Sequence, residues 1–514
     1  MEVEEGLMEV VQVKLSILFF SFTLSFLSFS LLLFFLRSKH AWCNCHVCKS
    51  YLNSSWTADF DNLVDWYSHL LLRSPTQTIH IHVLDNIVTA NPDNVEYMLK
   101  TNFDNFPKGK AFSSILGDLL GDGIFNADGE LWNFQRKMAS LELGSTSVRS
   151  NAFDIVSSEV RIRLFPLLDS VSSSCGTIDL QDIFRRFSFD TICKISFGLD
   201  PGCLDLSLPI SEFAAAFDLA TSLSARRAIA TSPIVWKVKR LLNWGSEREL
   251  RKAIELVDVL AAEVIRQRRK LGFSSKDDLL SRFMGSVGDD KYLKDIVISF
   301  LLAGRDTVAS GLTVFFFLLS NHPEVVGKMR EEIDRVVGNN IGGGGGDQAV
   351  PSYENLRRMN YVHAALYECL RLYPPVQFDS KFCVDDDVLA DGTFAKKGTR
   401  VTYHPYAMGR MDTIWGSDCS SFRPERWLRS HDGSFVPKNP FEFPVFQGGT
   451  RVCLGKEMSL MEMKTVVVSV IRRFDVEVGS TRLPKFAPGL TATLGGGLSA
   501  RVRRRGRSSE GYHC

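Results

Sequence analysis

One cysteine stands in a sequence context that suits binding of a metal through sulfur. Cys453 lies between Gly449 and Gly455, and a segment with helical apolar periodicity follows it as far as about Phe474. The start of a helix stabilises a thiolate through the helix dipole and the free backbone amides, and the thiolate is the form that ligates iron. Gly449 allows a tight turn, and Gly455 lets the backbone approach a flat macrocycle. Taken alone, Cys453 is more typical of a buried structural cysteine between glycines.

An arginine close to this cysteine could hold an acidic group of such a macrocycle. Arg451 precedes the cysteine by two residues and can form charge-assisted hydrogen bonds with a carboxylate. Trp132 and Arg136 are one helical turn apart in a second segment. The alternative interpretation of that pair is an exposed amphipathic helix.

A third motif, Ala303-Gly-Arg-Asp306-Thr307, interrupts a long apolar helical pattern. The small pair Ala303-Gly304 permits a local bulge in the helix. A hydroxyl and a carboxylate at this point could organise the water that delivers protons to a bound dioxygen molecule. The alternative is a threonine that bonds its own helix backbone beside a surface aspartate.

Two further charged motifs lie between these segments in the chain. Glu368 and Arg371 are one helical turn apart, and Arg426 follows in a Pro-Glu-Arg-Trp sequence. Together they could form a buried Glu-Arg-Arg cluster that holds the fold around the cysteine loop. Alone, Glu-x-x-Arg occurs by chance in many helices.

Composition and missing signatures exclude several function classes. Sixty Lys and Arg residues against 59 Asp and Glu give a net charge of +1, so binding of nucleic acid through phosphate neutralisation is not expected. The sequence has no Gly-x-Ser-x-Gly elbow, no His-Glu-x-x-His motif, no Walker loop, and no nicotinamide or flavin fingerprint. Its 11 cysteines are odd in number and mostly scattered, which favours a reducing, cytosol-facing location.

The N-terminal region contains an uncharged run, Leu15–Leu36, between Lys14 and Arg37. It exceeds the about 20 residues that cross a bilayer, which predicts one transmembrane helix. A cleaved signal peptide is the alternative, but the run is long and no Ala-x-Ala-like site follows it. Acidic residues precede the run and basic residues follow it, so the positive-inside rule places the C-terminal body in the cytosol.

Three cysteines and a histidine follow the anchor closely. The sequence Cys43-x-Cys45-His46-x-Cys48 offers four soft ligands. Structural zinc sites more often use two separated pairs of ligands, so the spacing suits zinc poorly. The alternative is a juxtamembrane segment whose thiols serve packing or acylation.

The remaining pattern predicts a mainly α-helical protein with small β-sheets and one large catalytic domain, because no segment between the motifs resembles an interdomain linker. Helices are expected at 151–170, 246–271, 292–320, 323–337, 354–372 and 455–473, and strands at Thr78–Val83, Asn86–Ala90, Gly398–Tyr403 and after Phe474. The expected organisation is a lumenal N-terminus at 1–14, the anchor at 15–36, a linker at 37–55, the catalytic domain at 56–500 and a basic flexible tail at 501–514. A glycine run, 342–346, is expected to form a surface loop.

Taken in their order, these motifs resemble the cytochrome P450 superfamily, whose haem-ligand signature matches Phe446-x-x-Gly449-x-Arg451-x-Cys453-x-Gly455. The resemblance implies the P450 fold behind an N-terminal transmembrane helix, with haem b held by Cys453 as the axial ligand of its iron. It implies that Arg451, Trp132 and Arg136 bind the haem propionates. It also implies O2 as co-substrate, electrons from NADPH through a separate NADPH-cytochrome P450 reductase, and an endoplasmic reticulum membrane location with the catalytic domain facing the cytosol.

The residues around the motifs narrow the resemblance to one group within the superfamily. The stretches 125–137, 187–192, 373–381 and 403–410 are similar to the plant clan of fatty-acid ω-hydroxylases, and within it to family 94 and its C subfamily. This similarity implies oxidation of the terminal carbon of a carboxylate-bearing chain, such as a fatty acid or jasmonoyl-isoleucine, from the 12-hydroxy to the 12-carboxy form in the second case. The usual proline-rich hinge after the anchor is not evident.

Three alternative functions must be compared with this one. A haem-thiolate isomerase that rearranges peroxides, or a non-catalytic haem protein, would not need the Asp306-Thr307 pair that this chain retains. A monooxygenase acting on another hydrophobic plant metabolite is a further alternative.

Terminal oxidation sends the carboxylate of the substrate away from the iron, where a desolvated charge needs a cation. The candidates are Arg226 and Arg227, in the 205–245 stretch that resembles the family's pocket roof, and Lys381. The alternative is that all three are ordinary surface charges.

Overall fold

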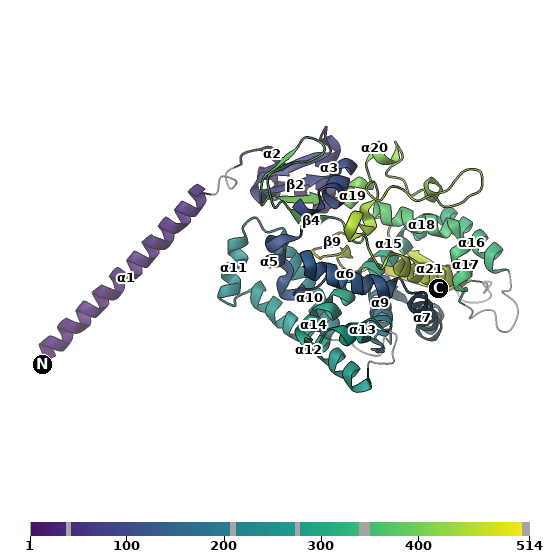
Figure 1. Ribbon diagram of the computed structural model, residues 1–514, viewed down its shortest axis with the longest axis horizontal. Helices are drawn as coiled ribbons and strands as arrows, with labels where there is room; N and C mark the ends of the chain where they lie inside the picture. The colour runs from purple at the N-terminus through teal and green to yellow at the C-terminus, as the bar shows by residue number, and fades with distance from the viewer. Residues whose placement is uncertain (1, 38–42, 206–211, 273–277, 339–349, 506–514) are drawn as a thin grey trace.

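The computed structural model describes residues 2–37, 43–205, 212–272, 278–338 and 350–505. Its first helix, α1 (Glu2–Arg37), stands apart from the body (Figure 1). The stretch Lys14–Leu31 of this helix is apolar and long enough to cross a membrane, and none of it is buried. A second stretch of sufficient length, Asp290–Asn321, is 83% buried and is a core helix. The expected apolar helix is therefore present as a candidate membrane span, and it continues without a break into the predicted N-terminal segment.

The body is mainly helical with small sheets, as the sequence predicts, and β2 (Asn86–Thr89) and β4 (Asp379–Phe382) of the main sheet lie at its upper left in Figure 1. Its helices are α2 (His46–Leu52), α3 (Leu63–Arg73), α4 (Pro92–Glu96), α5 (Gly109–Leu120), α6 (Gly129–Leu143), α7 (Thr146–Glu159), α8 (Phe165–Ser173), α9 (Leu180–Phe197), α10 (Glu212–Ala228), α11 (Pro233–Leu241), α12 (Ser246–Leu271), α13 (Leu279–Ser286), α14 (Asp290–Leu301), α15 (Thr307–Asn321), α16 (Pro323–Val337), α17 (Tyr353–Arg358), α18 (Asn360–Leu372), α19 (Pro405–Met408), α20 (Asp412–Trp415) and α21 (Lys456–Arg473).

The helices that carry the three central motifs meet in the core. A β-carbon at Gly311 of α15 would lie 3.0 Å from the sulfur of Met463 in α21 and 3.6 Å from Leu370 in α18. Because glycine allows this approach, α15, α18 and α21 pack closely around one another, and their apolar side chains belong to one buried cluster. The packing places the segments of Thr307, Glu368 and the Cys453 loop around a common centre.

Four strands form the main sheet in the order β1-β2-β7-β4. They are β1 (Thr78–Ile81), β2 (Asn86–Thr89), β7 (Arg400–Tyr403) and β4 (Asp379–Phe382). Strand β7 runs parallel to β2, with Val88 opposite Thr402, and the other two pairs are antiparallel. The smaller pairings are β5 (Asp387–Val388) with β6 (Phe394–Ala395), β9 (Phe486–Ala487) with β10 (Thr493–Leu494), and β3 (Thr177–Asp179) and β8 (Phe474–Val478) on either side of β11 (Ser499–Arg504).

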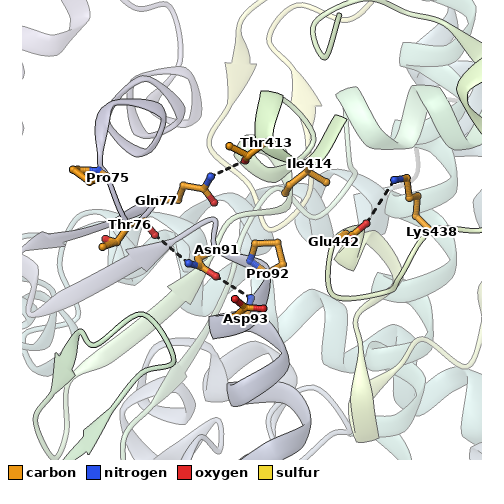
Figure 2. Close-up of a pocket in the computed structure, with 10 residues that line it drawn as sticks. All are labelled: Pro75, Thr76, Gln77, Asn91, Pro92, Asp93, Thr413, Ile414, Lys438 and Glu442. Carbon is orange, nitrogen blue, oxygen red and sulfur yellow. Dashed lines mark hydrogen bonds and ion pairs between the residues drawn. The ribbon is translucent and has the colours of Figure 1, made fainter. Parts of the chain in front are cut away.

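A pocket on the surface lies between the start of this sheet and the segment that precedes the cysteine loop (Figure 2). Its polar groups already bind one another: Gln77 donates to Thr413 at 2.7 Å, and Lys438 pairs with Glu442 at 3.7 Å. None of its lining residues belongs to a predicted motif. It therefore contributes nothing to the predicted chemistry.

The segment 37–55 was predicted to be a linker, but most of its described part packs onto the body. Helix α2 lies there, and its Cys48 is fully buried. The ring of Tyr51 stacks on Trp66 with centroids 6.2 Å apart, and its hydroxyl donates to the backbone carbonyl of Ile229 at 2.6 Å. Aromatic burial against α3, which the short sequence pattern does not reveal, makes this segment part of the domain.

The predicted basic tail also needs correction at its start. Residues 501–504 belong to β11, which pairs with β3 and β8. Ala500 and Val502 are each 2% exposed, whereas Arg501 and Arg503 face solvent. The alternation has the period of a strand, and the arginine run conceals it. Residues 506–514 of the predicted tail, and the glycine run 342–346, lie outside the described residues.

We predict that β11 is needed for stability. Val502→Asp places a carboxylate in a buried apolar site without a partner, and should lower the free energy of unfolding by roughly 2–4 kcal/mol. The control Arg501→Asp changes an exposed position of the same strand and should have little effect. Denaturant unfolding of the purified protein measures both, and equal effects would contradict the assignment of this segment to the sheet.

Candidate active site

The cysteine loop is fixed by a turn that only glycine can make. Gly449 has a φ of +60°, and a β-carbon there would lie 1.9 Å from the backbone oxygen of Leu99. The turn lets the amide of Cys453 donate to the carbonyl of Phe446 at 2.8 Å. The sulfur then stands just before α21, as the sequence predicts. Apart from its chain neighbours and the nearby helix backbone, a β-carbon at Gly455 would meet only this sulfur, at 3.9 Å, so other segments do not crowd the backbone at Gly455.

Burial and the neighbouring polar groups act on the pKa of the Cys453 thiol in opposite directions. The side chain is accessible, yet protein atoms crowd around it, and this desolvation raises the pKa of the thiol. The backbone amides of Gly455 and Lys456 donate to the sulfur, and the charge of Arg136 also lowers its pKa. A metal ion bound to the sulfur would displace its proton outright. The sulfur is therefore arranged as a ligand with amide support.

Arg451, Trp132 and Arg136 gather beside this loop. The guanidinium of Arg451 lies 4.5 Å from the Trp132 ring and donates to Asp128 at 2.6 Å. Its Nε is buried without a hydrogen-bond partner among the described residues. Arg136 donates to the backbone carbonyl of Val452. The structure thus brings the three predicted side chains to the cysteine loop and leaves one buried donor to serve an acceptor.

A second group of cations lies next to Arg451 and was not predicted. Asp379 of β4 accepts hydrogen bonds from Lys108, from Lys381 at 3.2 Å and from the Tyr403 hydroxyl at 3.1 Å. Lys381 is fully buried, and burial lowers the pKa of its ammonium group well below the usual range. Lys108 and Lys381 thus share the single carboxylate of Asp379. Asp379 and Lys381 are neighbours on β4, but Lys108 and Tyr403 are distant in the sequence and reach them only through the fold.

The proton-delivery motif lies at a break in the long core helix. Residues Leu302–Asp306 form one turn of π-helix between α14 and α15, which matches the expected bulge. The hydroxyl of Thr307 donates to the carbonyl of Ala303 at 2.6 Å, and both residues are partly exposed, unlike most of their neighbours. The hydroxyl oxygen keeps its lone pairs for a further donor. The structure therefore combines the backbone bond of the alternative interpretation with a partly exposed side chain.

Asp306 is buried and paired rather than free. Arg305 donates to Asp306 at 2.8 Å and to Asp218 of α10 at 2.6 Å. Burial raises the pKa of the Asp306 carboxyl, and the charge of Arg305 opposes this. The network links the core helix to α10, and Arg305, in the centre of the motif, was overlooked as its organiser.

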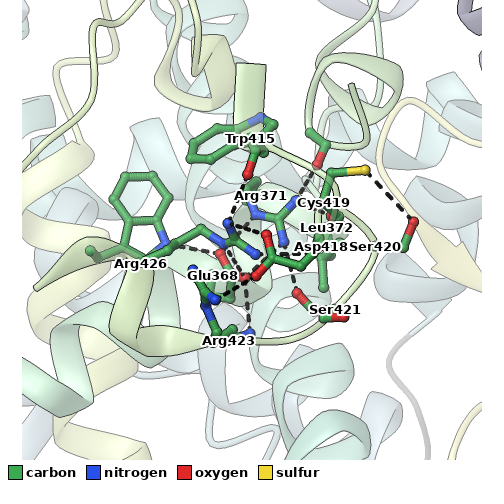
Figure 3. Close-up of polar contacts among 12 residues, drawn as sticks. Glu368, Arg371, Leu372, Trp415, Asp418, Cys419, Ser420, Ser421, Arg423 and Arg426 are labelled. Atoms are coloured by element: carbon green, nitrogen blue, oxygen red, sulfur yellow. Dashed lines mark hydrogen bonds and ion pairs between the residues drawn. The ribbon is translucent and has the colours of Figure 1, made fainter. Parts of the chain in front are cut away.

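Glu368, Arg371 and Arg426 lie together in the core (Figure 3). Arg371 donates to the two carboxylate oxygens of Glu368, each at 2.7 Å, and Arg426 donates to one of them at 2.8 Å. The Nη2 atom of Arg371, which binds Glu368, also donates to the carbonyl of Ser421 at 3.0 Å. The cluster therefore ties α18 to the irregular segment that leads to the cysteine loop.

The predicted carboxylate-binding residues do not gather at one place. Arg226 is exposed at the end of α10. Arg227 is buried and pairs with Glu247 and, at 2.8 Å, with Asp118. Lys381 lies in the cation group beside Arg451.

These residues fit a dianionic haem. A helix-start sulfur offers the iron ligand, the uncrowded backbone at Gly455 allows a flat ring to approach, and the buried Nε of Arg451 and the nearby guanidinium of Arg136 suit the propionates. Haem bound through a cysteine thiolate supplies iron that binds and activates dioxygen. Of the protein groups, Cys453 would hold the iron, Arg451, Arg136 and Trp132 would orient the ring, and Thr307 would hold a water and pass on its proton. The fold and site define a helical haem-thiolate enzyme.

Comparison with known proteins identifies the family. The cytochrome P450 family model matches residues 65–495, and the chain belongs to this family of haem monooxygenases. Cytochrome P450 94C1 of Arabidopsis thaliana is 58% identical over 499 residues, which cover 96% of this chain and 99% of that protein. Cytochrome P450 94B3 of Arabidopsis thaliana is 48% identical, with 88% and 90% covered, and cytochrome P450 94A2 of Vicia sativa is 43% identical, with 88% and 89% covered. The resemblance to family 94 is confirmed, and the protein is an oxidoreductase.

We predict that Cys453 is the only protein ligand of the iron. Cys453→Ala or Cys453→Ser should abolish the thiolate-type band of the reduced carbon-monoxide complex, because no other sulfur occupies the loop. Cys203→Ser, a change at a partly buried free cysteine, should keep the band. Persistence of the band in Cys453→Ala rules the assignment out.

For Thr307 we predict a loss of coupling rather than of binding. Thr307→Ala should still bind haem and substrate, but it should divert reducing equivalents to peroxide, because the proton relay is broken. Thr313→Ala is a matched control, since Thr313 donates to Ala309 at 2.6 Å in the same way but is fully buried. The measurement is product formed per NADPH consumed. Equal coupling in Thr307→Ala and the parent would show a purely structural threonine.

Proposed function

We propose that this P450 inserts one oxygen atom from O2 at the terminal carbon of a carboxylate-bearing, lipid-like substrate. Fatty acids and jasmonoyl-isoleucine are the proposed substrates, with the alcohol oxidised further to a carboxylic acid. The similarity to cytochrome P450 94C1 over nearly the whole of both chains carries this proposal. The partly exposed Thr307 side chain beside the paired Asp306 supports oxygen activation over peroxide rearrangement.

The proposed electron source is NADPH through a separate reductase, and the proposed location is the endoplasmic reticulum membrane with the body in the cytosol. Helix α1 supports the membrane attachment. A second apolar surface lies on and just after α11, where Val235, Leu241 and Trp244 are 57%, 84% and 66% exposed. Exposed apolar side chains of this size suit contact with lipid.

Arg400 is the cation that we propose for the substrate carboxylate. It begins β7 and is partly exposed, and it donates to the Ser380 hydroxyl and to the carbonyl of Ala228, each at 2.8 Å. Ala228 ends α10, in the region that resembles the pocket roof. Arg400 therefore lies where the roof meets the sheet.

The charge of Arg400 lacks a close counter-ion. No carboxylate lies within ion-pair distance of it in the described part of the chain, whereas Arg227 pairs with two acids. Burial lowers the pKa of Arg400, and the more distant Asp379 opposes this. An incoming carboxylate would offset the desolvation of the guanidinium through charge-assisted hydrogen bonds. Arg226, Arg227 and Lys381 remain the other candidates.

The test compares a free acid with its methyl ester. Arg400→Gln should weaken the preference for the acid by roughly 1–3 kcal/mol, the worth of a charged hydrogen bond. A purely structural defect would reduce turnover of acid and ester alike. Arg226→Gln, at an exposed position, serves as the control, and Arg227→Gln and Lys381→Gln test the earlier candidates. An unchanged preference in Arg400→Gln would contradict its role.

The proposed reaction itself is tested with the full-length protein in membranes. Oxidation of a fatty acid and of 12-hydroxy-jasmonoyl-isoleucine, offered in competition, should require both NADPH and the reductase. Turnover of a fatty-acid hydroperoxide without NADPH would instead indicate the isomerase. Oxidation of neither acid would reject the substrate class.

A further inference from the structure

Three cysteines outside the haem site converge on one point. The sulfur atoms of Cys43, Cys45 and Cys48 all lie within 4.8 Å of one another, and the structure has them as free thiols. Cys45 is the N-terminal cap of α2, and its sulfur accepts a hydrogen bond from the backbone amide of Cys48 at 3.4 Å. We propose that these three thiolates bind a thiophilic metal ion at the start of the catalytic body.

The arrangement suits ligation better than simple packing. The three residues differ in exposure, since Cys48 is fully buried, Cys43 is partly buried and Cys45 is exposed. One sulfur is thus fixed in the core while the cluster stays open to solvent on the side of Cys45, by which an ion can enter. An amide that donates to sulfur stabilises a thiolate. Three thiolates so close together would repel one another without a cation between them.

The donor set selects the class of ion. Thiolate sulfur favours zinc and monovalent copper over the hard cations magnesium and calcium, and the cluster includes no carboxylate. His46 is exposed and is not part of the cluster, so three sulfurs are the described protein ligands. Monovalent copper is satisfied by three sulfurs, whereas zinc would take a solvent molecule as its fourth ligand. Both ions share the same thiolate chemistry, and the experiment distinguishes them.

A metal here would fasten the segment after the anchor to the body. Cys48 belongs to the buried cluster that also contains Trp66 and Ile81. Tyr51, on the same short helix, bonds to the carbonyl of Ile229 just beyond α10. The ion would hold α2 in place between the main sheet and the end of α10. This role does not depend on which substrate is oxidised.

The experiment measures metal in the full-length protein, purified under reducing conditions in detergent. Elemental analysis should find about one zinc or copper per haem iron in the parent and in Cys203→Ser. Cys45→Ser, which alters the exposed ligand and disturbs packing least, should lower this content by roughly tenfold or more. Added Co²⁺ should give a sulfur-to-metal charge-transfer band in the parent and in Cys203→Ser but not in Cys45→Ser, and Cu⁺ titration decides between the two ions.

Other outcomes would overturn the proposal. Cys45→Ser with the metal content of the parent would place the metal elsewhere. A parent that contains only iron and shows no cobalt band would exclude the site. A disulfide or a thioester-linked acyl chain on these cysteines, found by mass spectrometry of the intact protein, would assign them to another chemistry. The reduced carbon-monoxide spectrum reports whether each variant is folded, independently of metal content.

Discussion

Much of this structure depends on one buried carboxylate. Glu368 has no exposed surface, and it accepts hydrogen bonds from Arg371, Arg426 and the indole of Trp427 at 2.7–2.9 Å. Loss of one partner from such a cluster leaves a buried charge uncompensated and typically costs about 3–5 kcal/mol. The chain between α18 and α21 contains only short helices and strands, so it has few backbone ladders of its own. Glu368 therefore fixes the path that delivers the sulfur of Cys453.

The sequence predicts helices best where apolar residues recur at three- and four-residue intervals without interruption, so that one face of the helix is apolar and the other is polar. The bounds expected for the helix at 246–271 are those of α12. The helix expected at 151–170 is interrupted by a π-turn just before Pro166, which lacks an amide for the regular ladder. The helix expected at 354–372 is divided at Met359 into α17 and α18. Periodicity reveals which face is buried, but a local change in backbone hydrogen bonding leaves that periodicity almost unchanged.

In the site, too, contiguous motifs could be predicted from the sequence, whereas contacts between distant residues could not. The cysteine loop and the Ala303–Thr307 motif are contiguous, so residue types and spacing were sufficient to find them. The link from Arg305 to Asp218 and the sharing of Asp379 by Lys108 and Lys381 join distant parts of the chain, and only the fold brings them together. Arg400 was missed for this reason too, since its environment is set by β4 and the end of α10. The fold also shows that Arg400 binds a hydroxyl and a carbonyl rather than a described carboxylate, at the place where a substrate carboxylate is proposed.

The central claim is that this P450 transfers one atom of dioxygen to the terminal carbon of an acidic substrate. The most direct measurement is turnover of a fatty acid under ¹⁸O2 in ordinary water, with NADPH and reductase, followed by mass spectrometry of the first alcohol product. The account predicts one ¹⁸O atom, located at the terminal carbon. Oxygen derived from water, or label at an internal carbon, would contradict it.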